Sequence, residues 1–312
     1  MRWHREAPGE GLCWISRRLV LLLLTALVMF GCGRASSPVA APREKGGLQV
    51  VVSIGPLGYF AQRVGGDRVQ VHVLMGPGTS PHDFEPTPAQ MRLLQQADIL
   101  VLNGVGLEFW ADKVVASADN PDLEVVTTSE GLDILQAPDG QGGNPHVWLD
   151  PINAIWQVAR IREAFVRLDP AGEEIYNTNS ARLVEDLKAL DRDIMLTLAA
   201  LSQREVVSLH AAWAYFSRRY QLKEVAVIEE RPGEEPTPAE LARLVQQARE
   251  MGVRVIVVEP QMSAKAAEVI AAEAGMQLVS LDPIGIPPEY DYLRTMRANA
   301  QALADALRAA GP

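Results

Sequence analysis

Cysteine is almost absent from this 312-residue chain, which contains only Cys13 and Cys32. Two arginines and then the uncharged run "LVLLLLTALVMF" (residues 19–30) lie between them. A bilayer-spanning helix needs about twenty apolar residues, so this shorter run predicts the core of a signal peptide covering residues 1–31. Because Cys13 would be removed with that peptide, we expect no disulfide bond in the exported fold.

The residue that follows this apolar segment, Cys32 in "GCG", resembles a bacterial lipoprotein cleavage site. Cleavage there would make Cys32 the acylated first residue and would anchor the protein to a membrane. An ordinary secretory signal followed by an incidental cysteine is the alternative. Residues 32–47 are rich in proline, alanine, serine and glycine, so we expect a flexible tether between the lipid and the fold.

Basic residues are fewer than acidic ones. The chain has 29 Lys and Arg and 39 Asp and Glu, which gives a net charge of −10. Removal of residues 1–31 would change the net charge to −12, since that segment holds four arginines and two glutamates. A surface of this charge repels nucleic acid and anionic lipid headgroups and attracts cations. We therefore expect no nucleic-acid partner.

The rest of the chain repeats itself loosely. "VVSIGPLGYFAQR" (residues 51–63) is matched by "VVSLHAAWAYFSR" (206–218), and "EPTPAQMRLLQQA" (85–97) by "EPTPAELARLVQQA" (235–248). Each Thr-Pro pair reads as the N-cap and first residue of a helix. Two matches in the same order indicate two halves of similar topology.

Each half holds four short β-branched runs that alternate with helical patterns, such as "DILVLNG" from Asp98 and "VRVIVVEP" from Val253. Continuous apolar runs between helices are typical of a parallel sheet that is buried on both faces. The sequence therefore predicts an α/β protein of two similar lobes, residues 48–170 and 202–312, each a four-stranded parallel sheet flanked by helices.

One long helix is expected between the lobes, over residues 171–201. Its apolar positions fall three and four residues apart, on one face: Leu183, Leu187, Leu190, Ile194, Leu198 and Leu201. A helix of this length would span roughly 46 Å at about 1.5 Å per residue. We expect it to join the lobes as a rigid strut. Asp150-Pro151 is expected to cap the helix before it.

Histidine is also scarce, and three of the five follow predicted strands. His82 lies in "SPHDFEPTP", His146 in "NPHVWLDP" and His210 in "VVSLHAAWAYF", while Asp282 in "LVSLDPIG" follows a strand of the second half. Open α/β sheets bind ligands where their strands end. Three imidazoles and a carboxylate, two from each lobe, would form a four-coordinate site for a first-row divalent ion, most naturally Zn²⁺.

Other polar and aromatic residues near these positions are weaker candidates for a part in the metal site. Asp83 and Glu85 would either orient an imidazole N–H or form a solvated loop edge. His72 lies within a predicted strand and is left out of the site. Four aromatic residues beside the ligands are expected to belong to the core: Trp148, Trp213, Tyr215 and Phe216.

At this point the sequence resembles a known family, the cluster A-I zinc- and manganese-binding substrate-binding lipoproteins of bacterial ABC importers. The motifs that carry the resemblance are "PHDFEPTP", "NPHVWLDP", "HAAWAYFSRRY", "EEPTPAELA" and "EPQMSAKAAEVIAAEAGMQLVSLDPIG". They are spread over residues 48–285. The resemblance implies two parallel-sheet lobes tied by one long helix, with the metal ion held between them by His82, His146, His210 and Asp282.

The resemblance also implies an activity. Such a protein captures Zn²⁺ outside the cytoplasm, on the outer face of the cytoplasmic membrane or in the periplasm, and passes it to a permease driven by an ATPase. Within the family a histidine at the third ligand position accompanies zinc and a glutamate accompanies manganese, so His210 favours zinc. The segment "LQAPDGQGGNPH" lacks the long His-rich loop of many zinc members, which keeps Mn²⁺ as an alternative metal.

Two other functions remain as alternatives. A zinc hydrolase also uses three histidines, but it needs an open coordination position and a general base. If Asp282 fills the fourth position, no water is left to activate, so we expect a binding protein and not an enzyme. A role as an adhesin rests only on a family label. We expect a monomer.

Overall fold

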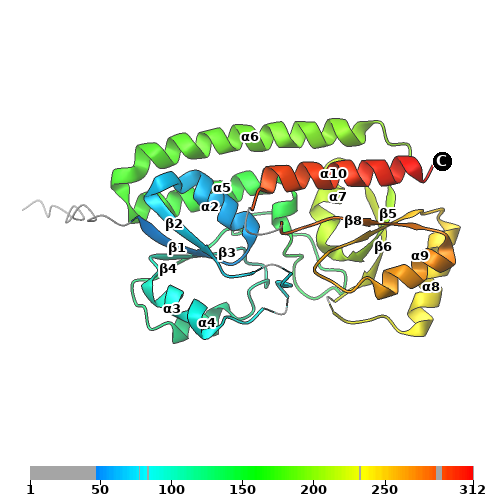
Figure 1. Cartoon of the computed structure of the whole chain (residues 1–312), viewed down its shortest axis with the longest axis horizontal. Helices are drawn as coiled ribbons and strands as arrows, with labels where there is room; N and C mark the ends of the chain where they lie inside the picture. Colours follow the sequence, from blue (N-terminus) through cyan, green and yellow to red (C-terminus); the bar gives the residue numbers. More distant parts are fainter. Residues whose placement is uncertain (1–46, 77, 83, 232, 286–289, 312) are drawn as a thin grey trace, which may run out of the picture. The chain divides into compact units, whose positions relative to one another are not determined.

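Two four-stranded parallel sheets with the same strand order form the frame of the protein (Figure 1). The computed structural model describes residues 47–76, 78–82, 84–231, 233–285 and 290–311. The predicted signal peptide, Cys32, Asp83 and nearly all of the predicted tether lie outside these residues. No helix within the described ranges has both the length and the apolar character needed to cross a membrane.

The first sheet has the order β2-β1-β3-β4 and the second has the order β6-β5-β7-β8. Every pairing within them is parallel, for example Val51 opposite Leu100 in the first sheet and Ser208 opposite Val257 in the second. The strands are β1 (Leu48–Val52), β2 (Val69–Val73), β3 (Ile99–Leu102), β4 (Glu124–Thr127), β5 (Glu205–His210), β6 (Lys223–Glu229), β7 (Val255–Val258) and β8 (Gln277–Ser280). The prediction of two similar four-stranded lobes is confirmed.

Helices cover the faces of both sheets. They are α2 (Gly55–Gly65), α3 (Pro88–Gln96), α4 (Ala111–Ser117), α5 (Pro151–Leu168), α6 (Glu173–Ala199), α7 (Ala214–Tyr220), α8 (Pro238–Glu250), α9 (Lys265–Ala274) and α10 (Tyr292–Ala309). The repeated Thr-Pro pairs begin α3 and α8 with complete capping boxes, in which Thr87 pairs with Gln90 and Thr237 with Glu240. Asp150 caps α5 through a hydrogen bond from the Ile152 backbone N–H (2.8 Å). These three helix starts are therefore as predicted.

The long helix α6 runs beside both sheets and packs on helices from each half of the chain (Figure 1). Its predicted inward face is buried, including Leu183, Leu190 and Leu198. The helix is slightly shorter than predicted, because Pro170–Gly172 form a 3₁₀ turn before it and it ends at Ala199. Leu201, expected in the helix, is buried just beyond its end.

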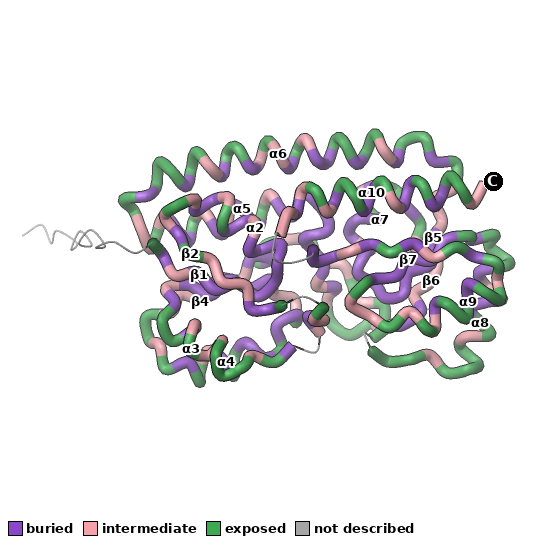
Figure 2. Tube along the Cα trace, viewed as in Figure 1, coloured by how far each residue is buried: buried purple, intermediate pink, exposed green. Residues whose placement is uncertain are grey.

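One continuous apolar core joins the two sheets. It contains Val50 of β1, Leu187 of α6 and Val257 of β7. The central strands β1, β3, β5 and β7 are almost entirely buried, while the outer face of α6 is exposed (Figure 2). The last helix adds to this core, because the ring of Tyr292 in α10 contacts that of Phe60 in α2, with centroids 4.9 Å apart. A wide separation of the lobes would therefore expose apolar surface, which is unfavourable in water.

Candidate metal centre

The three histidines that the sequence singles out come from three different kinds of local structure. His82 lies on a short turn after β2, where its backbone N–H donates to Ser80 Oγ (3.3 Å). His146 precedes the 3₁₀ turn Val147–Leu149 that leads into α5. His210 is the last residue of β5. His146 and His210 are each only 4% exposed, and His82 is half-buried.

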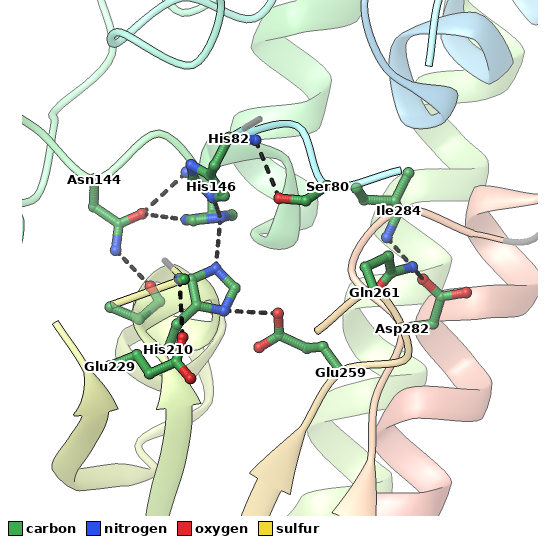
Figure 3. A network of polar contacts seen from close by, with 12 residues as sticks. Ser80, His82, Asn144, His146, His210, Glu229, Glu259, Gln261, Asp282 and Ile284 are labelled. Atoms are coloured by element: carbon green, nitrogen blue, oxygen red, sulfur yellow. Dashed lines mark hydrogen bonds and ion pairs between the residues drawn. The ribbon is translucent and has the colours of Figure 1, made fainter. Parts of the chain in front are cut away.

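The structure brings these three imidazoles together (Figure 3). His146 Nε2 lies 3.3 Å from His82 Nε2 and 3.2 Å from His210 Nε2. A single lone pair on His146 cannot accept a proton from both neighbours, and facing lone pairs at this distance repel unless a cation lies between them. A tetrahedral zinc ion with Zn–N bonds of about 2.0–2.1 Å places its ligand nitrogens about 3.3–3.4 Å apart. The spacing therefore suits three ligands of one tetrahedral ion.

Asn144 fixes the orientation of His146. Its Oδ1 atom accepts from the His146 backbone N–H (3.0 Å) and lies 2.9 Å from His146 Nδ1. The ring must then carry its proton on Nδ1, which leaves the Nε2 lone pair facing the other histidines. Asn144 Nδ2 also donates to the Ala211 carbonyl (2.6 Å), which directly follows β5. One side chain thus couples a first-lobe histidine to the second lobe.

Glu259 holds the corresponding position beside His210. Its Oε2 atom lies 2.7 Å from His210 Nδ1, with a bent geometry that falls short of a full hydrogen bond. Sequence analysis missed Glu259, which directly follows the run "VRVIVV". Its position in the sequence could have identified it as a candidate, since a polar residue immediately after a buried parallel strand lies at the ligand-binding edge of the sheet.

Burial keeps two of the imidazoles neutral. It lowers the pKa of His82 to about 3, with a smaller contribution from the neighbouring His210. Burial also lowers the pKa of His146 well below its usual value, again with contributions from the other two histidines. Because a metal ion binds only the neutral imidazole, these two side chains are in the protonation state that ligation requires.

The histidines line two hollows. A very small one, with a volume of about 10 Å³, lies among the three imidazoles, Glu259 and Gln261. A larger cavity of about 310 Å³ also reaches the imidazoles and is bordered by the segment 137–145 and by Arg231. Arg231 Nε donates to Asp139 Oδ2 (3.1 Å), so an ion pair between the two halves of the chain borders this cavity. The larger cavity therefore adjoins all three histidines.

Asp282, the predicted fourth ligand, is not part of the group of close ligand atoms formed by the three histidines. Its Oδ1 atom accepts from Gln261 Nε2 (2.9 Å) and from the backbone N–H groups of Ile284 (3.0 Å) and Gly285 (2.9 Å). In Figure 3 the side chain of Gln261 is drawn between Glu259 and Asp282. Ligation by Asp282 therefore stays a prediction.

The remaining candidates do not belong to the cluster of three histidines or lie outside the described residues. Glu85 is exposed, and its predicted role in orienting an imidazole stays a prediction, as does that of Asp83. His72 is half-buried in the edge strand β2, opposite Val51. Trp148 and Tyr215 are fully buried and belong to the packing around the site, as expected.

Comparisons with known proteins agree with this arrangement. Residues 50–306 match the family described as "Zinc-uptake complex component A periplasmic". The chain is 29% identical to the high-affinity zinc uptake system protein ZnuA of Bacillus subtilis, over 93% of this chain and 97% of that protein. It is also 29% identical to the manganese-binding lipoprotein MntA of Halalkalibacterium halodurans, over 92% of this chain and 97% of that one.

A solved structure, described as the crystal structure of ZnuA, superposes with a TM-score of 0.78. It is 33% identical to the present chain and matches 84% of this chain and 100% of that one. The family match covers α6, all three clustered histidines and both sheets except for the first two residues of β1. The chain belongs to the family of periplasmic A components of zinc-uptake complexes.

Proposed function

We propose that the protein captures Zn²⁺ outside the cytoplasm and delivers it to an ABC permease that is driven by an ATPase. The observation that carries this proposal is the convergence of three imidazole Nε2 atoms, two of them 3.2 and 3.3 Å from the third. Membership of the zinc-uptake family and the likeness to a zinc uptake protein support the same function. Zn²⁺ is the cargo in this proposal.

Capture and release follow from where the ligands come from. His82 and His146 precede the long helix α6, and His210 follows it. An ion held by all three therefore bridges the two halves of the chain. A small separation of the lobes would remove ligands and lower the affinity, which gives a permease a way to take the ion. The shared core keeps such a movement small.

Asp282 is proposed as the fourth ligand. The hydrogen bonds described for its carboxylate all end on Oδ1, from Gln261, Ile284 and Gly285. Binding of the ion would then require the carboxylate to turn or shift toward the histidines. A carboxylate in this place would also offset one of the two positive charges of the ion.

The donor set favours zinc over manganese. Relatives named for zinc and for manganese are equally similar to the chain, so overall identity does not separate the two metals. Imidazole nitrogen suits Zn²⁺, whereas oxygen-rich sites suit Mn²⁺. Three nitrogen ligands and one proposed carboxylate therefore support Zn²⁺ as the main cargo, with Mn²⁺ as the alternative.

Substitution of His210 tests this metal preference. A His210→Glu change replaces a nitrogen ligand by oxygen, and we expect the ratio of the Zn²⁺ to the Mn²⁺ association constant to fall at least about tenfold. Because a new carboxylate would face Glu259, the same change is also made together with Glu259→Gln, which removes the repulsion between like charges. Competitive titration of both metals gives the ratio. An unchanged ratio in both variants would contradict the assignment of zinc by donor type.

Membrane attachment and oligomeric state belong to the same proposal. We propose that Cys32 carries the lipid anchor, so that the protein acts as a monomer at the outer face of the cytoplasmic membrane or in the periplasm. The apolar run before Cys32 and the lipoprotein named among the relatives support the anchor. The protein is proposed to bind its cargo without chemistry, because family members are binding components of importers.

A further inference from the structure

Glu259 occupies a special place in the second sheet. It directly follows β7, which pairs with β5, the strand that ends at His210. From β5 the chain continues to β6 on one side of the pair, and from β7 it continues to β8 on the other side. The strand order therefore reverses between β5 and β7, and α/β sheets bind ligands at such a switch point. Glu259 is only 3% exposed, and it lines the small hollow among the three imidazoles.

The contact with His210 determines which ring nitrogen faces the metal. Glu259 Oε2 lies 2.7 Å from Nδ1, so a proton on Nδ1 is attracted to the carboxylate, whereas a lone pair there would be repelled. With the proton on Nδ1, the lone pair of Nε2 faces His146 Nε2 at 3.2 Å. The position of Glu259 thus selects the tautomer of His210 that can bind a metal ion.

The two fixed histidines are held by groups of different charge. His146 is held by the neutral amide of Asn144, whereas His210 is held by a carboxylate. A carboxylate behind a ligating imidazole increases the electron density that the imidazole donates to the metal. It also places a negative charge near a dication in a buried site, where charges interact strongly. Together with the proposed ligand Asp282, Glu259 would balance the two charges of Zn²⁺.

We propose that Glu259 is a positioning residue for metal capture, which acts through His210 and does not touch the ion itself. This inference rests on the proposed function, because it requires that His210 binds Zn²⁺. Partners of this kind typically change metal affinity by about 10- to 100-fold when they are removed. We expect an effect of that size for Glu259.

Two substitutions separate the roles of shape and charge. Glu259→Leu removes the acceptor and the charge, and its dissociation constant for Zn²⁺ should rise about 10- to 100-fold. Glu259→Gln keeps an oxygen beside Nδ1, so its affinity should lie between those of the Leu variant and the unchanged protein. The visible absorption of bound Co²⁺ should change in the Leu variant and be largely restored in the Gln variant, because it reports the geometry of the ligands.

Glu108 supplies a matched control in the first lobe. It is also buried next to its sheet, where Ser53 Oγ (2.6 Å) and the Asn103 backbone N–H (2.8 Å) donate to its carboxylate. Because these partners are not the clustered histidines, Glu108→Gln should leave the Zn²⁺ affinity and the Co²⁺ spectrum unchanged. Circular dichroism and thermal unfolding without metal establish that each variant folds.

A double-mutant cycle tests whether Glu259 acts through His210. In a His210→Ala background, Glu259→Leu should have almost no further effect on Zn²⁺ affinity, because its partner is gone. Additive losses would overturn the inference and would indicate that Glu259 binds the ion directly. An unchanged affinity of Glu259→Leu would overturn it as well. If the unchanged protein itself failed to bind Zn²⁺, the proposed function would fail, and the two failures are therefore distinguishable.

Discussion

His146→Ala is expected to reduce the affinity for Zn²⁺ by a factor of about 10² to 10³. His146 is the central member of the cluster, since its Nε2 atom is the one that lies near both other Nε2 atoms. Structural sites in zinc-finger peptides bind Zn²⁺ with about 10–16 kcal/mol, which over four ligands is about 2.5–4 kcal/mol for each. A loss of that size corresponds to the stated factor, at about 1.4 kcal/mol for each tenfold change.

Competition with a chelator of known affinity measures this loss, and His72→Ala is the control. His72 is a half-buried histidine of β2 that belongs to no group of close ligand atoms within the described residues. Its replacement changes the histidine content equally but should leave Zn²⁺ affinity within about twofold of the unchanged protein. Equal losses in both variants would mean that zinc binding does not depend on the cluster.

Mild acid is expected to remove most of the stabilisation that Zn²⁺ provides. In the closed cluster, burial lowers the pKa of His82 to about 3 and that of His146 well below its usual value. Separated or unfolded imidazoles titrate near about 6.5. The closed cluster therefore binds fewer protons than the separated histidines between about pH 6.5 and 3. Its stability is fully present above about pH 6.5 and is lost as the pH falls through this window.

Thermal unfolding at pH 7.5 and pH 5, with and without Zn²⁺, measures this effect. At a thousand times the dissociation constant, a ligand stabilises by about 4 kcal/mol, which raises the melting temperature of a chain of this size by about 8–16 °C. When the metal-free protein is open, each separated imidazole titrates near about 6.5 and must lose a proton to bind Zn²⁺ at pH 5, which lowers the affinity about thirtyfold. The rise at the same Zn²⁺ concentration should then be halved or smaller. An equal rise at both pH values would mean that the imidazoles are already neutral at pH 5 before the ion binds, as in the closed cluster, and would contradict capture by an open protein with separated histidines.

The architecture was predictable from sequence because its determinants are local and repeated. The Thr-Pro starts of α3 and α8 follow from the fixed φ of proline and from a side-chain cap, both of which act within four residues. The apolar face of α6 is visible in the spacing of its leucines, such as Leu183, Leu187 and Leu190. The packing of α10 on α2 of the other lobe has no such local signal, because the two helices are far apart in sequence.

The histidines were predictable as a group because each follows a predicted strand and histidine is scarce. Glu259 was not, since acidic residues after strands are common in this acidic chain, and its contact with His210 depends on β7 lying beside β5. The acidic segment "EERPGEEP" (residues 229–236) shows the same difficulty. Glu229 is buried at the end of β6 and accepts from the Gly233 backbone N–H (3.0 Å), which pattern alone does not distinguish from an exposed loop.

Crystals of the protein grown with Zn²⁺ provide the most direct test, through anomalous diffraction at the zinc edge. We predict a single peak bonded to Nε2 of His82, His146 and His210, with a carboxylate oxygen of Asp282 as the fourth ligand. A peak located elsewhere, or imidazoles turned apart with no ion between them, would contradict the account.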